Sequence, residues 1–127
     1  MSKLGSLNLA VKDLDAAAGF YSKLFGFPEL TTHRAEHFRV LDAKSVLLGF
    51  NDSLMAGDYG GVTSGGVILS FDVATRADVD RLSAEAVALG ATLKVPTRDT
   101  IFGAIEAKLT DLDGHAFRLL AWTTPPQ

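Results

Sequence analysis

The sequence contains no cysteine among its 127 residues. Disulfide bonds, zinc sites with thiolate ligands and cysteine nucleophiles are therefore excluded. A domain of this length can bury enough apolar surface to fold without disulfides or a structural metal. We therefore expect one domain that is held together by an apolar core.

Two further absences narrow the choice of partners. The chain has no cluster of basic residues, and its formal net charge is −3. Binding to nucleic-acid phosphates depends on clustered Lys and Arg, so we expect no nucleic-acid partner. No apolar run approaches the roughly 20 residues that span a bilayer. The start of the chain, Met1 to Gly5, also lacks the apolar stretch of a signal peptide. We expect a cytoplasmic protein with no membrane partner.

What the sequence does contain is one pattern that occurs twice. In the first half, an alternating strand pattern precedes a helix between Asp13 and Gly26. In the second half, the same order gives a helix between Thr75 and Gly90. The two copies are offset by roughly 62 to 64 residues. Half-domains of this kind bury a core by pairing with each other, so we expect a ligand cavity that both copies share.

The duplication sets the predicted domain organisation. We predict a single domain with repeat one over about 4–50, a linker over 51–65 and repeat two over about 66–122. Each repeat has the order βαβββ. The predicted fold is α+β, with a mostly antiparallel curved sheet around the shared cavity and the helices outside. The linker is rich in Gly, Asp and Ser and is a candidate flap over the cavity.

Period-2 alternation and turn residues place the strands within each repeat. Asp111 to Gly114 is a strong hairpin-turn signal before the final strand. The predicted strands lie at about 4–11, 28–34, 37–41 and 45–50 in repeat one, and at about 66–73, 92–97, 103–109 and 115–122 in repeat two.

Two motifs resemble a known family. The run from Leu9 to Asp15, followed by the run from Phe20 to Phe27, is similar to the opening of vicinal oxygen chelate proteins. That superfamily includes glyoxalase I, the bleomycin resistance proteins and the extradiol dioxygenases. The run from Asp111 to His115 resembles its closing turn, with Leu112 in place of the usual proline. The resemblance covers nearly the whole chain and implies the same fold.

The resemblance also implies where a metal would be held. Metal-dependent members take ligands from the first and last strands of each copy, usually His in the first and Glu or Gln in the last. Such ligands leave positions open for a substrate with two adjacent oxygens. The corresponding residues here are Ser6, Leu47, Ile68 and Arg118. Serine is a weak ligand, leucine and isoleucine have no lone pair, and arginine is a permanent cation. We therefore expect no metal and no cofactor.

The histidines do not suggest another metal site. His33 and His37 are four residues apart, and on a strand this spacing separates them by roughly 13 Å. We interpret them as exposed residues at a hairpin tip, and His115 as a turn or surface residue. Glu106 is expected to face outward from its strand.

Strand alternation assigns the remaining candidates to the sheet face opposite the helices. The side chains on this face are smaller and more polar than those on the other, as a ligand groove requires. Its candidate ligand-binding residues are Ser6, Asn8, Leu47, Ile68, Ser70, Asp72, Arg118 and Trp122.

Arg118 is the most informative of these candidates, because a charge on an inner sheet face is costly unless it is paired. It either grips an anionic ligand through bidentate hydrogen bonds or forms a structural pair with Asp72 or Glu106. Trp122 is either a stacking wall for an aromatic ligand or a residue of the rim or of a dimer contact.

These expectations give three functional hypotheses. The first is a metal-free small-molecule binding protein, similar to the antibiotic-resistance branch of the superfamily, that sequesters an anionic or aromatic compound. The resemblance implies that it is a homodimer. The second is a superfamily enzyme, a lyase, isomerase or dioxygenase, with an atypical metal site or a metal-free mechanism. Asp72 is then the evident carboxylate, and no catalytic residue is assigned. The third is a scaffold or regulatory domain with a vestigial groove.

Overall fold

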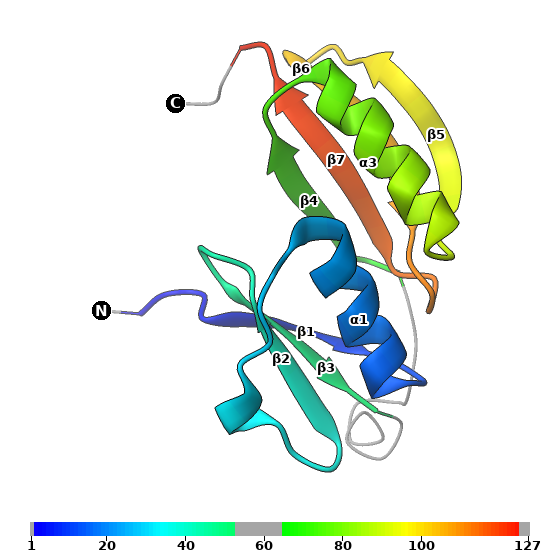
Figure 1. The fold of residues 1–127 in the computed structure, drawn as a ribbon. Helices are drawn as coiled ribbons and strands as arrows, with labels where there is room; N and C mark the ends of the chain where they lie inside the picture. The colour runs from blue at the N-terminus through cyan, green and yellow to red at the C-terminus, as the bar shows by residue number, and fades with distance from the viewer. Residues whose placement is uncertain (1, 53–64, 125–127) are drawn as a thin grey trace. The chain divides into compact units, whose positions relative to one another are not determined.

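The computed structural model describes residues 2–52 and 65–124, which fall into two compact units, Met1–Thr63 and Ser64–Gln127 (Figure 1). The described residues form two α-helices and seven strands in two mixed sheets, which confirms the expected α+β class. Three of the five strand pairings among them are antiparallel. Most of the expected linker, residues 53–64, lies outside the described residues, so its interpretation as a flap stays a prediction. The shared cavity stays a prediction.

The first unit is a three-stranded sheet with one helix. Strands β1 (Ser6–Ala10), β3 (Leu47–Asn51) and β2 (Phe38–Asp42) lie in the order β1-β3-β2. The β1–β3 pair is parallel and the β2–β3 pair is antiparallel. Helix α1 (Leu14–Phe25) follows β1 and contacts β2 and β3.

Helix α1 begins and ends at the residues that the sequence predicted. The Asp13 carboxylate accepts a hydrogen bond from the Ala16 amide at 3.0 Å, and Gly26 ends the helix at φ 73°. Its apolar side is buried, and Tyr21 stacks on Phe50 of β3 with ring centroids 5.8 Å apart. Burial of side chains this large is worth roughly 1.5–3 kcal/mol each. This packing holds α1 on the sheet.

The strand expected at 28–34 is wrong. This segment makes a single bridge, between Glu29 and Leu41, and then forms the 3₁₀ turn η1 (Thr31–His33). The amide of Leu30 donates to the Val40 carbonyl at 2.9 Å, but the ladder goes no further. Pro28 has no amide hydrogen to donate, so it contributes to the ladder only as an acceptor. On the other side of the bridge the chain leaves β2 because the 3₁₀ turn begins at Thr31.

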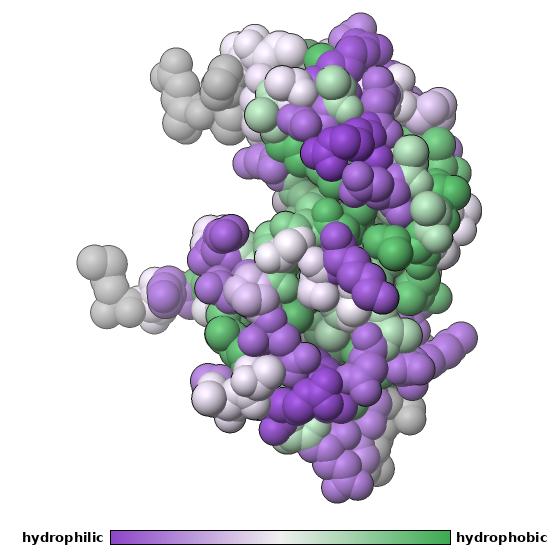
Figure 2. Space-filling model, in the orientation of Figure 1, coloured by the Kyte–Doolittle hydropathy of each residue, from purple (hydrophilic) through white to green (hydrophobic). Residues whose placement is uncertain are grey.

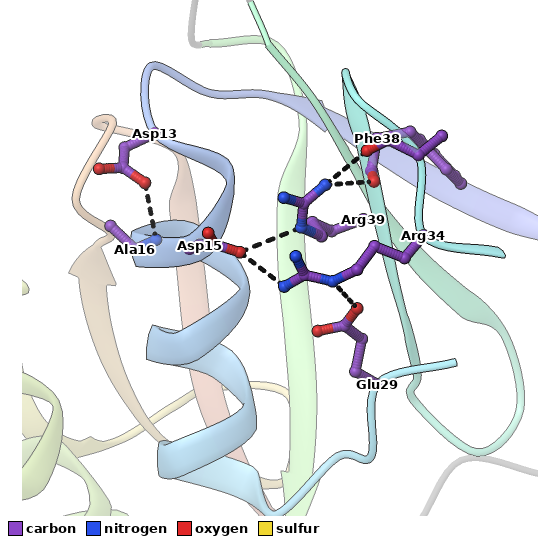
Figure 3. Close-up of polar contacts among 8 residues, drawn as sticks. Asp13, Asp15, Ala16, Glu29, Arg34, Phe38 and Arg39 are labelled. Carbon is purple, nitrogen blue, oxygen red and sulfur yellow. Dashed lines mark hydrogen bonds and ion pairs between the residues drawn. The ribbon is translucent and has the colours of Figure 1, made fainter. Parts of the chain in front are cut away.

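Ion pairs hold this segment against the start of α1 (Figure 3). Arg34 Nη2 and Arg39 Nε both donate to Asp15 Oδ1, at 2.8 and 3.0 Å. Arg34 Nε also donates to Glu29 Oε2 at 2.9 Å. The hydrogen bond from Arg39 is the main cause that lowers the pKa of Asp15. Side-chain pairs thus take over where the backbone ladder stops.

The second unit is a four-stranded sheet in the order β4-β7-β6-β5. Its strands are β4 (Ile68–Val73), β5 (Thr92–Asp99), β6 (Ala104–Thr110) and β7 (Ala116–Trp122). The β4–β7 pair is parallel and the other two pairs are antiparallel. The edge strand β5 contains two register shifts along β6, which bend it.

Helix α3 (Arg76–Ala88) contacts β5, β6 and β7. It begins with the predicted capping box, in which Thr75 and Asp78 exchange hydrogen bonds. The predicted turn also forms, with Asp111 Oδ1 accepting from the amides of Asp113 and His115 at 3.0 and 2.9 Å. Figure 2 shows both hydrophilic and hydrophobic side chains over the exposed side of α3, and Val87 of this helix is 46% exposed. In the part of the chain that is described, neither helix is long and apolar enough to cross a bilayer.

Gly90 is the position where the backbone most clearly needs glycine. Its φ is +108°, and an added Cβ would lie 2.7 Å from Leu112 Cδ2. We predict that Gly90→Ala destabilises the protein by about 1–3 kcal/mol, because an L side chain is strained in this conformation. Gly19→Ala, in open space on α1, should instead stabilise it by up to about 1 kcal/mol through helix propensity. Denaturant unfolding of both variants checks the pair, and an unchanged midpoint for Gly90→Ala would contradict the strain.

Candidate ligand-binding site

The second sheet carries polar and charged side chains on the face opposite α3. Cross-strand register and alternation put two rows on this face. The first row is Ser70, Arg118 and Lys108, and the second is Asp72, Leu120 and Glu106. The opposite face holds the apolar side chains that α3 covers, such as Phe117 and Leu119, which are at most 1% exposed. The predicted assignment of β4 and β7 residues to faces agrees with this register.

Glu106 lies among the cations of this face. It is directly opposite Arg98 on β5, and Oε2 of Glu106 accepts from Arg98 Nε at 3.0 Å, with Arg98 Nη2 also 3.0 Å away. Arg118 Nη1 lies 3.6 Å from the other oxygen, Oε1. That distance makes an ion pair but is too long for a hydrogen bond. We expected Glu106 to face outward. It does lie on the face away from α3, but only 2% of it is exposed.

Arg118 is held from three sides. Its Nε donates to Ser70 Oγ at 2.7 Å, its Nη1 faces Glu106, and its guanidinium carbon lies 5.5 Å from the centre of the Phe102 ring. A cation over an aromatic face is attracted by the ring quadrupole. Of the two structural partners considered for Arg118, the structure therefore selects Glu106 and not Asp72. The side chain of Arg118 is still 28% exposed, so the guanidinium remains accessible.

Asp72 and Trp122 form a separate pair on the same face. The indole Nε1 of Trp122 donates to Asp72 Oδ1 at 3.1 Å. The Trp122 ring also meets the Phe102 ring edge to face, with centroids 5.9 Å apart. Trp122 and Phe102 thus give the charged face an aromatic border.

A hollow of about 410 Å³ lies beside these groups, within the usual size range of small-molecule sites. Its lining residues are Arg98, Asp99, Thr100, Ile101, Phe102, Glu106, Lys108 and Arg118. Three cations face two carboxylates here, so the lining carries an excess of positive charge that attracts anions.

Four charged members of this lining, Arg98, Asp99, Glu106 and Lys108, were missed as ligand-binding candidates. The signal for two of them was present in the sequence. Glu106 and Lys108 alternate on β6, which pairs with the last strand, β7, where Arg118 lies. Extending the face assignment to β6 would have found them. The position of Arg98 opposite Glu106 depends on the register shifts of β5, which no local sequence pattern predicts.

The other predicted site residues belong to the first unit or to the start of β4. In the first unit Ser6 is opposite Leu47, and Asn8 Nδ2 donates to Ser6 Oγ at 3.1 Å. The side chain of Asn8 lies over Gly49, where an added Cβ would lie 3.0 Å from Asn8 Cγ. Ile68 stands at the start of β4 opposite Ala116 and is 58% exposed. The structure thus brings together Ser70, Asp72, Arg118 and Trp122 in the second unit, and Ser6, Asn8 and Leu47 in the first.

Two of the histidine interpretations need correction. His33 is exposed but lies in η1 and not at a hairpin tip. His37 is half-buried, and its Nδ1 lies 2.6 Å from Asp52 Oδ2. His115 lies at the closing turn, one of the two alternatives given for it, and its side chain is buried. The three histidines thus lie in separate turns.

Comparison with known proteins identifies the family. The chain matches the model of the Glyoxalase/Bleomycin resistance protein/Dioxygenase superfamily over residues 3–119, and it belongs to that superfamily. No functionally curated protein shows significant sequence similarity to it.

Solved structures of the same fold agree with this assignment. A glyoxalase/bleomycin resistance protein/dioxygenase family enzyme from Burkholderia phytofirmans PsJN is 30% identical, with a TM-score of 0.90 over 95% of this chain and 99% of that chain. A glyoxalase-related enzyme from Fulvimarina pelagi is 22% identical, with a TM-score of 0.82 over 95% and 88% of the two chains. The fosfomycin resistance protein FosX from Mesorhizobium loti is 18% identical, with a TM-score of 0.73 over 98% and 95%.

The metal site that the superfamily suggests does not fit the side chains of this chain. Arg118 stands at one ligand position as a permanent cation, paired with Glu106. At the other three positions, Ser6 is hydrogen-bonded to Asn8, and Leu47 and Ile68 offer no lone pair. Within residues 2–52 and 65–124, no three His, Asp or Glu side chains converge as metal ligands.

The contact between His37 and Asp52 predicts a shifted titration. The hydrogen bond to Asp52 is the main cause that raises the pKa of His37 above 6.5. Its stabilisation is therefore complete below the unfolded pKa of about 6.5 and is lost as the pH rises through the folded value. Asp52→Asn should lower the His37 pKa, measured by NMR titration of the ring protons. Asp42→Asn removes an equal charge elsewhere and should leave it unchanged. A His37 pKa that is the same in wild type and Asp52→Asn would refute the pairing.

Proposed function

We propose that the chain is a metal-independent small-molecule binding protein of this superfamily, and that it holds an anionic ligand in the hollow beside Arg118. The observation that carries the proposal is the guanidinium of Arg118, which is fixed by Ser70, Glu106 and Phe102 yet stays partly exposed. A guanidinium carries five N–H donors. Nε and Nη1 are engaged, and in the described residues Nη2 has no partner, so it is available to a carboxylate, phosphate or phosphonate oxygen.

The surroundings of Arg118 support the same ligand class. Lys108 is its direct cross-strand neighbour, and two like charges opposite each other repel unless an anion joins them. Glu106 offsets part of this charge but is shared with Arg98. Phe102 and Trp122 add apolar area for the body of a ligand, which suits an anion that carries an aromatic or planar group. An anionic headgroup with a flat apolar body therefore fits best.

Sequestration is the activity that we propose for this binding site. The superfamily takes part of its name from bleomycin resistance proteins. Binding alone would protect a cell, because a sequestered compound cannot reach its target. Within this proposal the protein works as a cytoplasmic homodimer.

A second candidate is an enzyme of the same superfamily. It is favoured by the 30% identical structure from Burkholderia phytofirmans, which is described as a family enzyme. Its carboxylate would be Glu106, which is buried beside the hollow, and not Asp72, whose carboxylate is engaged with Trp122. Sequestration predicts that a bound compound is recovered unaltered, by mass spectrometry, after prolonged incubation with the protein. Turnover of the compound would favour the enzyme.

The binding proposal predicts the effect of Arg118→Ala. Calorimetric titration with 3-phenylpropanoate, an aromatic carboxylate, should give an affinity at least tenfold lower than wild type. A hydrogen bond to a charged group is worth about 1.5–3 kcal/mol, and 1.4 kcal/mol is tenfold. The control is Arg81→Ala, which removes an equal charge from α3, where Arg81 pairs with Asp78 and Glu85. Equal affinities for wild type and Arg118→Ala would reject the role of Arg118.

The metal-independent part of the proposal has its own test. Protein purified without a histidine tag should contain no stoichiometric metal in elemental analysis. Zn²⁺, Mn²⁺, Co²⁺ and Ni²⁺ at ten molar equivalents should not raise its melting temperature, since a ligand that binds only the folded state must raise it. A bound metal that stabilises the fold would refute this part.

A further inference from the structure

We propose that Oε1 of Glu106 recognises a hydrogen-bond donor on the ligand. The site then selects anions that carry a hydroxyl or ammonium group on the carbon next to the acidic group, the chemistry of 2-hydroxy acids and amino acids. This inference rests on the proposed function and narrows its ligand class.

The two oxygens of Glu106 have unequal surroundings. Oε2 is satisfied by Arg98, which donates from Nε at 3.0 Å. Oε1 is buried, and in the described part of the chain no donor is within hydrogen-bond reach of it. An ionised carboxylate can only accept, and a buried acceptor without a donor costs free energy. Glu106 nevertheless lines the hollow, beside the partly exposed guanidinium of Arg118.

Arg118 is the obvious donor for Oε1, but it is held away. Its Nε is fixed by the 2.7 Å hydrogen bond to Ser70, and its guanidinium lies over the Phe102 ring. These contacts leave Nη1 at 3.6 Å from Oε1. The cation and the acceptor therefore lie side by side, and in this proposal each binds a different atom of one ligand.

This pair of groups sets a geometric condition on the ligand. An anionic oxygen that accepts from Arg118 lies about 2.8 Å from the guanidinium, and a donor to Oε1 lies about 2.7 Å from the carboxylate. The Nη2 atom, free in the described residues, belongs to the same guanidinium as Nη1, which lies 3.6 Å from Oε1, so the two ligand atoms must be near neighbours. A hydroxyl or ammonium on the carbon that bears the acidic group meets this condition. An anion without a donor would instead place its charge beside Oε1, where like charges repel.

Two acids that differ by one hydroxyl test the inference on the full-length protein. The probes are 2-hydroxy-3-phenylpropanoate, with both enantiomers measured separately, and 3-phenylpropanoate. We expect wild type to bind the better hydroxy acid enantiomer at least about tenfold more tightly, because a site with a buried polar group rejects a ligand that leaves it unpaired. Calorimetric titration gives both dissociation constants.

The variant Glu106→Gln tests whether Oε1 is the atom responsible. Arg98 needs an acceptor, so the amide oxygen turns toward Arg98 and the NH₂ group replaces Oε1. A donor then stands where an acceptor stood. The preference for the hydroxy acid should fall to about onefold, while the affinity for 3-phenylpropanoate is kept or rises. Glu85→Gln makes the same chemical change on α3 and should keep the full preference.

The possible results distinguish a failure of the Oε1 role from a failure of the proposed function. Equal binding of the two acids by wild type would overturn the role of Oε1 while leaving an Arg118-dependent anion site. A preference that survives Glu106→Gln would also overturn it. Saturable binding of neither acid would overturn the proposed function, and the inference with it. The wild-type comparison needs no variant, so it decides the question even where Glu106→Gln does not fold.

Discussion

The buried carboxylate of Glu106 is the interaction on which the charged face of the second sheet depends. Two arginines and a lysine approach one another on this face, and without an anion among them they would repel. Glu106 draws Arg98 from one side and Arg118 from the other, and Ser70 and Phe102 fix the remaining freedom of Arg118. A buried ion pair contributes little net stability, because desolvation offsets much of its attraction. Its effect here is to hold two cations at defined positions beside a hollow.

The features that the sequence predicted well are local ones. Asp13, Thr75 and Gly26 stand within a few residues of the helix ends that they define, so their effect does not depend on the rest of the fold. Alternation along β4 and β7 likewise determines which side chains share a face, because the period of a strand is fixed by its backbone. The exception in the first unit shows the limit of such patterns. The segment at 28–34 contains strand-forming residues, but ion pairs to Asp15 hold a turn there.

The candidate site was predictable only in part, since its geometry arises between strands. The sequence indicated that Arg118 needs a partner, and it offered Asp72 and Glu106 without a way to choose. The choice depends on the register of β6 against β7, on the irregular pairing of β5, and on the indole of Trp122, which engages Asp72. The loss of the superfamily ligands was different. It could be established from the sequence alone, because leucine and isoleucine cannot coordinate a metal in any conformation.

The parallel pairing of β4 with β7 has a consequence for the order in which the second unit folds. Strand β4 is the first strand of the unit and β7 is the last. The hydrogen bond between Arg118 and Ser70 joins residues 48 positions apart. A contact of this range forms only after a long loop has been closed, which is slow compared with the formation of a hairpin such as β5–β6. On a ribosome, a chain that has not yet released β7 would hold Glu106 and Arg98 but not Arg118. The charged face beside the hollow is therefore complete only when synthesis of the unit is complete.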